Sequence, residues 1–410
     1  MNGSMAKNAA AFRVSAFALS VLLVGANLAS PLYATFAHQL GFDSLILTMI
    51  YATYVGTLIP SLVLAPVLAY RWGFRSVVGF GLVAMAAGVG LFAIGTSAGV
   101  LFAARAMQGV AVGMSSGALS AALAQTEPRG DVSRGAVVAT AVTTFATGAG
   151  PVLAGALAEV SAWPTKACFL AEGVAVFAAL GGLLWVPNEL GRSGVWRAPR
   201  LPRIPGGRRR SFWLACCYSA LAWAVTAAFL SVVPTLVHDL VGGPAFLASG
   251  AAAGALLLLS GATQLVSRRW VSDAVAQRMG ALVLVGALAI LGLGSMTGSV
   301  TAILVAASVG GIGQGLAFMG ALGTVTSMTA DAERPTALSG FYVVTYLAVG
   351  VPVIGIGACA LVFGLAAAIE LFVGMSLLLL VALLVVSHSS QLATCDVAGV
   401  GDPRRRSSDC

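Results

Sequence analysis

The sequence lacks several features that enzymes and energised pumps require. It has no nucleotide-binding Gly-Lys-Ser/Thr loop and no nucleophile–base motif, which argues against ATP-driven work and against an enzyme. Its three histidines, His38, His238 and His388, are too scattered along the chain to indicate a metal cluster. Its six cysteines show no metal-ligand spacing. We therefore expect no metal site and no cofactor.

Charged residues are also scarce, at 9% of the chain, and apolar residues gather in twelve long runs. Each run has about twenty residues or more, enough for a helix to cross a hydrocarbon core about 30 Å thick. Every backbone amide in that core must be satisfied within its own segment, so helices are expected. The pattern predicts an all-α polytopic membrane protein with spans at residues 12–37, 44–70, 76–97, 98–125, 136–160, 165–187, 211–238, 244–266, 280–298, 299–328, 337–361 and 364–387.

Nearly all of the positive charge lies in alternate gaps between these runs. Of the 22 Lys and Arg residues, all but Arg105 and Lys166 lie in the N-terminus, the even-numbered loops or the C-terminal tail. The positive-inside bias then predicts that both termini are cytoplasmic. The net charge of +8 is explained by arginines beside anionic lipid, without a nucleic-acid partner.

A polar stretch rich in Pro and Arg, residues 188–210, is typical of a cytoplasmic linker. It divides the chain into an N-terminal six-helix bundle (1–187), a C-terminal six-helix bundle (211–387) and a cytoplasmic tail (388–410). Four features recur in the same order at offsets near 200: Arg71-Trp72 with Arg269-Trp270, Gln108-Gly109 with Gln314-Gly315, Pro151 with Pro352, and Glu172 with Glu370. Two parallel repeats imply a pseudo-twofold axis along the membrane normal, with the substrate site between the halves.

The fourth span, residues 98–125, contains the one cation well inside a predicted span, Arg105. Burying it costs roughly 2.5–3.5 kcal/mol on insertion scales, so such a residue usually faces a wet cavity or a partner. We interpret Arg105, with Gln108 beside it, as a substrate or coupling residue; a local pairing that fixes the span is the alternative. Gly109 and Gly113 form a smooth stripe with Gly117 that lets another helix approach closely.

The fifth span, residues 136–160, combines a helix-bending proline with glycines on the same face, Gly148, Pro151 and Gly155. We expect this bend to pack tightly along a helix of the other half and to seal the halves against leak. In the eleventh span, Pro352 with Gly350 and Gly355 suggests an equivalent seam.

With these motifs the chain resembles the twelve-helix members of the major facilitator superfamily, closest to the drug:proton antiporter-1 group of bacterial exporters. The fourth-span motif of that group is matched by Arg105, Gln108, Gly109 and Gly113, and most of its fifth-span antiporter motif by Gly150, Pro151 and Gly155. Ala146 and Ala154 stand where that motif usually has glycine. The resemblance implies proton-driven export of small, mainly apolar organic compounds by alternating access in the bacterial inner membrane. The expected partners are a small-molecule substrate, protons and the lipid bilayer, and the protein is expected to be a monomer.

The loop after the second span departs from the pattern of that family. The family usually has Gly-x-Leu-x-Asp-Arg-x-Gly-Arg-Arg there, and this chain keeps Arg71, Gly73 and Arg75. Tyr70 replaces the acid that, in the family, helps to hold the cytoplasmic gate closed. The resemblance therefore implies a conformational role for this loop, with a different latch or readier inward opening.

The residue that carries the proton is not evident from the first span. Many relatives have an acid there, whereas this chain has Asn27, Ser30 and Tyr33. The acids well inside spans are Glu172 and Glu370. A carboxyl group in a low dielectric favours its neutral form and can exchange a proton in the physiological range, which predicts a coupling role. The alternative is that both are hydrogen-bonded structural residues on peripheral helices.

Polar and aromatic residues on several spans, the first included, are candidates for the cavity wall. They are Asn27, Tyr33, Tyr51, Tyr54, Trp223, Gln314, Tyr342 and Tyr346. Cavities for apolar drugs are often aromatic, although packing or an interfacial belt would explain each residue singly. A proton-linked or facilitative carrier for a defined metabolite, such as a sugar or amino acid, is the alternative function. A non-transporting sensor would need a soluble output domain, for which the loops and tails are too short.

Overall fold

The computed structural model describes residues 2–188, 190, 208–329 and 333–399, and these residues form helices joined by short loops. Before the linker the helices are α1 (Asn2–Asn27), η1 (Ser30–Leu32), α2 (Tyr33–Leu40), α3 (Ser44–Trp72), α4 (Phe74–Ile94), α5 (Ala98–Gln125), α6 (Val132–Val160), α7 (Ala167–Gly182) and η2 (Leu183–Trp185). After it they are α8 (Arg209–Ser231), α9 (Val233–Val241), α10 (Phe246–Ser267), α11 (Asp273–Thr297), α12 (Val300–Ser327), α13 (Arg334–Phe363) and α14 (Leu365–Gly399). Within the described residues they make twelve segments long and apolar enough to cross a membrane. The predicted fold class is confirmed: the protein is a multi-pass, all-α membrane protein.

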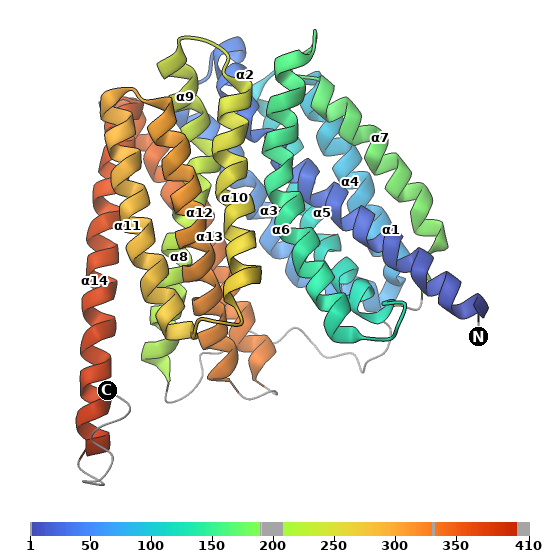
Figure 1. The fold of residues 1–410 in the computed structure, drawn as a ribbon. Helices are drawn as coiled ribbons and strands as arrows, with labels where there is room; N and C mark the ends of the chain where they lie inside the picture. The colour runs from blue at the N-terminus through green and yellow to red at the C-terminus, as the bar shows by residue number, and fades with distance from the viewer. Residues whose placement is uncertain (1, 189, 191–207, 330–332, 400–410) are drawn as a thin grey trace.

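The helices run up and down between two ends of the molecule (Figure 1). One end, called here the basic end, carries Arg71, Arg134 and Arg269, together with the start of α1. The opposite end, called here the far end, carries α2 and α9 with His38 and His238. This arrangement places the even-numbered loops together at the basic end.

The helices begin and end at residues suited to those positions. Side chains before α3, α5, α6 and α12 accept a backbone N–H of the first turn, and they are Asp43, Ser97, Asp131 and Ser299. At the far end, α2 and α9 both stop at a glycine in the left-handed conformation, Gly41 (φ 66°) and Gly242 (φ 73°). The two halves therefore terminate their first spans in the same way.

Those first spans are broken, whereas the sequence predicted continuous helices. The break follows Asn27 in the first span and Ser231 in the seventh. Pro31 and Pro234 lie just beyond the breaks, and proline has no N–H with which to bond the carbonyl four residues back. A carbonyl freed in this way inside a membrane protein needs another donor.

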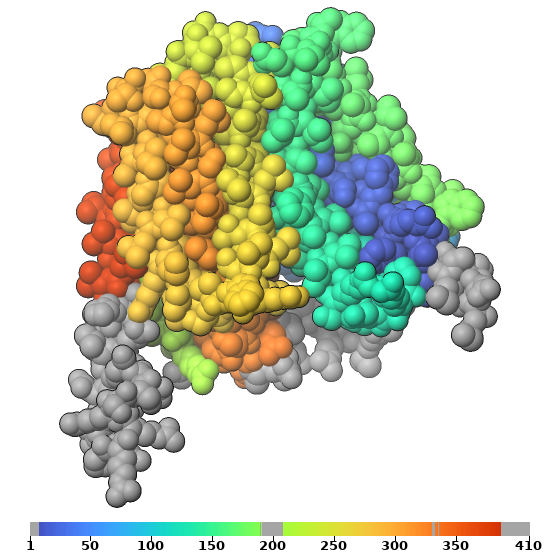
Figure 2. All heavy atoms as spheres, viewed as in Figure 1, coloured from blue at the N-terminus to red at the C-terminus, as the bar shows by residue number. Residues whose placement is uncertain are grey.

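The two halves meet along two helix pairs related by the repeat. The fifth span, α6, packs along the eighth, α10, and the second span, α3, packs along the eleventh, α13. α6 and α10 lie together toward the far end and diverge toward the basic end (Figure 1). Figure 2 shows the same two helices in contact on the face turned to the viewer.

The outer faces of the peripheral helices are strongly apolar. Val174 and Phe177 of α7 are 72% and 67% exposed, and Met375 and Leu378 of α14 are 63% and 74% exposed. A soluble protein rarely exposes so much apolar surface without a partner. Lipid chains cover such a surface in a bilayer, as the span pattern predicts.

Most of the predicted linker, residues 188–210, and the last part of the predicted tail, 400–410, lie outside the described residues. The last helix, α14, continues to Gly399 and is therefore longer than the predicted span of 364–387. Its membrane-compatible part ends at Val386, close to the predicted end.

Candidate functional site

A cavity of about 440 Å³ lies between the two halves. Its lining comes from the basic-end parts of α5, α6, α10 and α12, with additions from α8 and α13. The lining residues are Ser120, Ala136, Ala139, Thr140, Thr143, Thr144, Thr147, Trp223, Leu257, Ser260, Gln264, Gln314, Phe318, Leu322 and Tyr342. No charged side chain is among them. The size falls within the usual range of small-molecule sites, about 300–1,000 Å³.

Three of the predicted cavity residues line this space, and all three belong to the second half. They are Trp223, Gln314 and Tyr342. Trp223 packs edge-on against Phe318, with ring centroids 5.6 Å apart, and its buried Nε1 has no hydrogen-bond partner among the described residues. A buried donor without a partner beside a cavity is suited to bond a ligand, because leaving it unpaired is costly.

Gln314 belongs to a short chain of hydrogen bonds along the cavity wall. Its Oε1 accepts a hydrogen bond from the Ser260 hydroxyl, and that hydroxyl accepts one from Gln264 Nε2 at 3.1 Å. These bonds hold the side chains of Ser260, Gln264 and Gln314 in place on the cavity wall.

A row of threonines on α6 belongs to the site, although it was not predicted from the sequence. Thr140, Thr143, Thr144 and Thr147 all line the cavity. Their spacing of three and four residues is that of one helix face, so the signal was present in the sequence. It was overlooked because hydroxyl residues inside a span commonly bond their own backbone, as Thr140 and Thr147 do.

Arg105 is buried, only 3% exposed, and is not a lining residue of the cavity. Its Nη1 donates to the Ala26 carbonyl at 2.7 Å and to Gln108 Oε1 at 2.8 Å. Gln108 Nε2 in turn donates to the Gly25 carbonyl at 2.9 Å. The two side chains thus satisfy carbonyls of the last turn of α1, directly before the break in the first span.

The guanidinium of Arg105 also lies against tyrosines of α3. Its Cζ is 4.6 Å from the ring centroid of Tyr54 and 5.4 Å from that of Tyr51, distances typical of cation–π contacts. Among the described residues no carboxylate lies within ion-pair distance of Arg105, and its buried Nε has no hydrogen-bond partner. The charge is therefore held by carbonyl oxygens and aromatic rings, and its Nε–H donor is without a partner.

Glu172 and Glu370 occupy different environments although the repeat pairs them. Glu172 on α7 is buried, and its Oε1 has no hydrogen-bond partner among the described residues. A Cβ placed on Gly25 would lie 3.0 Å from that oxygen, so the carboxyl group packs on the same turn of α1 that Gln108 bonds. Glu370 is exposed on the outside of α14.

The other predicted residues of this region pack around the first span. Asn27 donates to the Leu23 carbonyl within α1. Tyr33 is buried, stands edge-on to Tyr51 with centroids 6.3 Å apart, and has no partner for its hydroxyl among the described residues. Tyr346 is half-buried beside Tyr342. None of these, nor Tyr54, is a lining residue of the cavity.

The glycines of the fourth and fifth spans lie against backbone. A Cβ on Gly113 would meet the Leu58 carbonyl of α3 at 2.6 Å, and one on Gly109 would meet the Tyr54 carbonyl. Gly150 faces α1, where a Cβ would lie 2.7 Å from the Val24 carbonyl. Gly117, in contrast, faces open space.

The fifth-span seam joins α6 to α10 of the other half. A Cβ on Gly148 would lie 2.7 Å from Leu258 Cγ, and one on Gly155 would meet the Phe246 carbonyl. Pro151 lies opposite Gly250, whose own Cβ would meet the Pro151 carbonyl. The contact is therefore backbone on backbone.

The predicted counterpart in the eleventh span differs in detail. Nothing lies within 4 Å of a Cβ on Gly355, so this glycine is not part of a seam. Gly357 takes the position against α3, where a Cβ would lie 2.9 Å from the Ser44 carbonyl, and Gly350 makes a looser contact with Ala52. The expectation for Gly355 was wrong because the facing side of α13 is offset by two residues.

The loop after the second span is tied to the end of the sixth span rather than to the other half. The Arg75 side chain donates to the carbonyls of Leu184 and Val186, and its backbone N–H donates to Asn188 Oδ1 at 3.0 Å. Gly73 has φ 86°, a value that favours glycine, and Asn188 closes over it. Arg71 is exposed.

Two of the three histidines that are too scattered along the sequence to indicate a metal cluster lie side by side in the structure, and the side chain of His388 is outside those described. His38 and His238 stack at the far end with ring centroids 4.6 Å apart, and His38 Nε2 is 3.7 Å from Asp239 Oδ1. Their separation of 200 residues is the repeat offset, so the axis that relates the halves brings the two positions together. The repeat offset near 200 residues was therefore the sequence signal for this pair.

These features define a membrane transporter built from two related halves. A family model described as Major Facilitator Superfamily matches residues 15–301, and the chain belongs to that superfamily. Comparison with curated protein sequences finds no match.

Solved structures of three kinds of transporter share the fold over nearly the whole chain. A POT family transporter in complex with 5-aminolevulinic acid aligns with a TM-score of 0.75 at 13% identity, covering 93% of this chain and 96% of that chain. The nucleoside transporter NupG aligns with a TM-score of 0.71 at 13% identity, covering 92% of this chain and 98% of that chain. A bacterial homolog of the human lysosomal transporter Spinster, in an inward-facing and unoccupied conformation, aligns with a TM-score of 0.70 at 11% identity. The alignment covers 93% of this chain and 95% of that chain. Identities this low show the fold alone. The assignment as a transporter rather than an enzyme rests on the superfamily match.

Proposed function

We propose that this protein exports small, mainly apolar organic molecules from bacterial cells by proton antiport, as a member of the drug:proton antiporter-1 group. The observation that carries the proposal is the uncharged cavity wall, where Trp223, Phe318 and Tyr342 face the threonine row of α6. Such a wall gives an ionised carboxylate or phosphate nothing to pair with, and burying an unpaired charge is costly. Aromatic walls favour flat, neutral or weakly polar compounds.

The proposed orientation places the basic end, both termini and the linker in the cytoplasm of the inner membrane. The cavity then lies on the cytoplasmic side, while α2 and α9 meet at the outer side. An exporter loads from the cytoplasm, so this arrangement corresponds to its loading state. Impermeant cysteine reagents added to intact cells should not label positions introduced in 188–210.

The proposed proton carrier is Glu172 rather than Glu370. Glu172 is buried on the turn of α1 that precedes the break, whereas Glu370 faces outward. A carboxyl group buried without a partner favours its neutral form, and ionisation would require a new partner. Arg105 and Gln108 bond the same turn of α1, so proton loss at Glu172 would act on the broken span through that turn.

The α6–α10 and α3–α13 pairs are the proposed rocking contacts between the halves. In alternating access the halves tilt about the substrate site, and close backbone contact limits leak of protons and substrate between them. Gly148 and Gly155 provide that contact on α6.

A facilitative or proton-linked carrier for a neutral polar metabolite is the second candidate. Gln264, Gln314 and Ser260 together with the threonine row offer hydrogen bonds to hydroxyl groups. A nucleoside or sugar would use this wall, and the nucleoside transporter NupG has the same fold.

Inverted membrane vesicles with an acidified lumen separate the two candidates. Addition of a transported compound should release protons from the lumen if the protein is an antiporter, and neutral aromatic compounds should be the most effective. Vesicles with the Arg105→Ala variant are the matched control. Transport of sugars or nucleosides without proton release, and no response to aromatic compounds, would favour the second candidate.

A further inference from the structure

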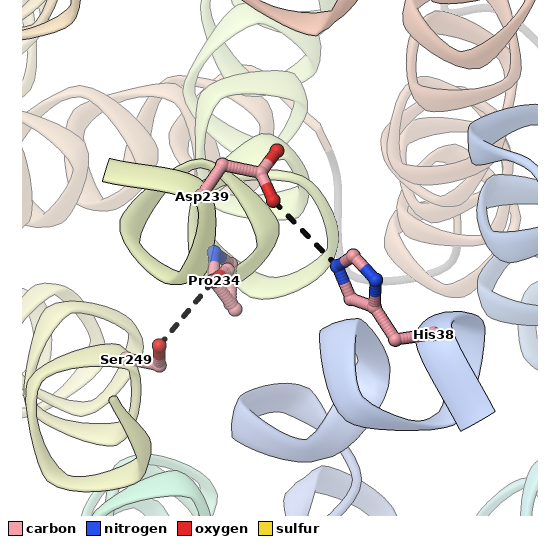
Figure 3. A network of polar contacts seen from close by, with 4 residues as sticks. All are labelled: His38, Pro234, Asp239 and Ser249. Carbon is pink, nitrogen blue, oxygen red and sulfur yellow. Dashed lines mark hydrogen bonds and ion pairs between the residues drawn. The ribbon is translucent and has the colours of Figure 1, made fainter. Parts of the chain in front are cut away.

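The far end of the molecule contains a cluster of metal-ligating side chains that the transport mechanism does not use. His38 of α2 and His238 and Asp239 of α9 each offer one ligand atom, and these three atoms lie within 4.8 Å of one another. Figure 3 shows His38 turned across the gap toward Asp239. The cluster joins the first half of the chain to the second.

The backbone positions of the ligand residues are set by the ends of their helices. His38 and His238 lie in the last turns of α2 and α9, directly before Gly41 and Gly242 end those helices. α9 is also held from the side, because the Ser249 hydroxyl of α10 donates to the Pro234 carbonyl at 3.3 Å (Figure 3). The backbone of α9 is therefore held in place, while the side chains of His38 and Asp239 are 60% and 47% exposed and free to adjust.

The contacts observed between the three side chains do not account for the arrangement. The 3.7 Å separation of His38 Nε2 and Asp239 Oδ1 is too long for a hydrogen bond, and an exposed ion pair of this kind contributes about 0–1 kcal/mol. Two imidazoles stacked at 4.6 Å would repel each other if both were protonated. A cation shared by two neutral imidazoles and one carboxylate satisfies all three groups.

We propose that His38, His238 and Asp239 form a binding site for a divalent transition metal of the Zn²⁺ class. Zinc takes His nitrogen and carboxylate oxygen at about 2.0–2.2 Å, which in a tetrahedron places neighbouring ligand atoms about 3.3 Å apart. The ligand atoms lie within 4.8 Å of one another, so rotation of the exposed His38 and Asp239 side chains is the movement that coordination would require. Position 39, the repeat counterpart of Asp239, is Gln39, so the protein supplies three strong ligands and solvent completes the coordination.

The metal bridges the two halves at the end where they are closed. Separation of α2 from α9, as alternating access requires, removes His38 from the other two ligands. A ligand that binds one state better shifts the population toward that state. Bound metal therefore stabilises the conformation with the far end closed.

Metal binding by the purified full-length protein tests the proposal without any knowledge of a transport substrate. Zn²⁺ would be titrated in competition with a chromogenic chelator at about pH 7.5, where histidine is mostly neutral. We expect one Zn²⁺ per chain at micromolar affinity, a thermal stabilisation that rises with Zn²⁺ concentration, and no competition from Mg²⁺. His38→Gln and His238→Gln should each lower the affinity by more than about tenfold, the loss expected even for an outer-shell partner.

The matched control is His388→Gln, which removes the remaining histidine of the chain and should leave Zn²⁺ affinity unchanged. The proposal fails if the wild-type protein binds no Zn²⁺ below about 100 μM, a value far weaker than typical protein zinc sites. It also fails if either His38→Gln or His238→Gln binds as tightly as wild type, since the two residues lie in different halves and both must contribute to a bridge. Failure of export would not affect these outcomes.

Discussion

The two halves share one helical plan but place different chemistry at related positions. In the first half, Arg105 and Gln108 bond the last turn of α1, and Glu172 packs on it. In the second half, Gln314 bonds Ser260 in the cavity wall, and an aromatic series runs from Trp223 through Phe318 to Phe341 and Tyr342.

The difference shows how a duplicated scaffold divides its tasks. A buried charge needs fixed partners, and the broken first span supplies them as free carbonyls. A variable apolar ligand needs a broad aromatic wall, which the second half supplies. The comparison predicts that changes in the first half alter coupling, whereas changes in the second half alter substrate affinity.

The largest effect is expected from Arg105→Ala. The change removes charged donors from the Ala26 carbonyl and from Gln108, and such bonds are worth about 1.5–3 kcal/mol. We expect proton-coupled transport in vesicles to fall to background with the membrane level of the protein retained. Arg105→Lys should restore only part, because lysine lacks the planar fork of donors. Arg13→Ala, at an exposed arginine of α1, is the control, and full activity of Arg105→Ala would reject the coupling role.

A bulky residue in the α6–α10 seam should also impair transport strongly. Gly155→Leu forces a side chain against the Phe246 carbonyl, and overpacking of this kind costs about 1–3 kcal/mol. We expect slow or uncoupled export in vesicles with both bundles still folded. Gly355→Leu is the matched control, because a side chain there meets open space. Equal loss in both variants would contradict a special role for the seam.

Replacing the two glutamates that the repeat pairs should change the pH dependence of transport in one half and not in the other. Glu172→Gln fixes the neutral form of a buried group, so transport should lose its dependence on pH in the range where the wild-type rate changes. Glu370→Gln, on the exposed face of α14, should keep the wild-type profile. Rates measured in vesicles across a pH series test this, and unchanged profiles in both variants and in the double variant would place coupling elsewhere.

The smallest of these effects is expected in the second half. Trp223→Ala removes an aromatic wall residue and the unpaired Nε1 donor of the cavity. We expect KM to rise about tenfold, equivalent to about 1.4 kcal/mol, with the number of protons moved per substrate unchanged. Trp213→Ala, at an exposed tryptophan of the same helix, should leave KM unaltered. A change in the number of protons moved per substrate in Trp223→Ala would contradict the assignment of coupling to the first half and substrate affinity to the second.

The fold was largely predictable because lipid imposes simple rules on sequence. Length and apolarity predicted all twelve spans. The glycines around Pro151 predicted a tight contact with the other half because only backbone-to-backbone packing requires them. The breaks at Asn27 and Ser231 were missed, although Pro31 and Pro234 signal them in retrospect.

The site was less predictable, since it depends on which way each helix face turns. The repeat paired Glu172 with Glu370, but α7 turns its glutamate inward and α14 turns it outward. Arg105 was expected at the cavity but is not among its lining residues, and it bonds α1. Hydropathy does not report helix rotation, because either face of a span can be apolar.

The stacked histidines at the far end have a consequence for how such a chain diversifies. A residue that lies on a twofold axis faces its own copy, so in a duplicated gene one substitution in the ancestral half creates both members of the pair. Two arginines or two glutamates facing each other there would repel by like charge, whereas two neutral imidazoles can stack or can bind one cation together. While the two copies are still identical, positions on the axis are therefore open only to self-compatible side chains, and a difference such as Asp239 opposite Gln39 marks later divergence of the halves.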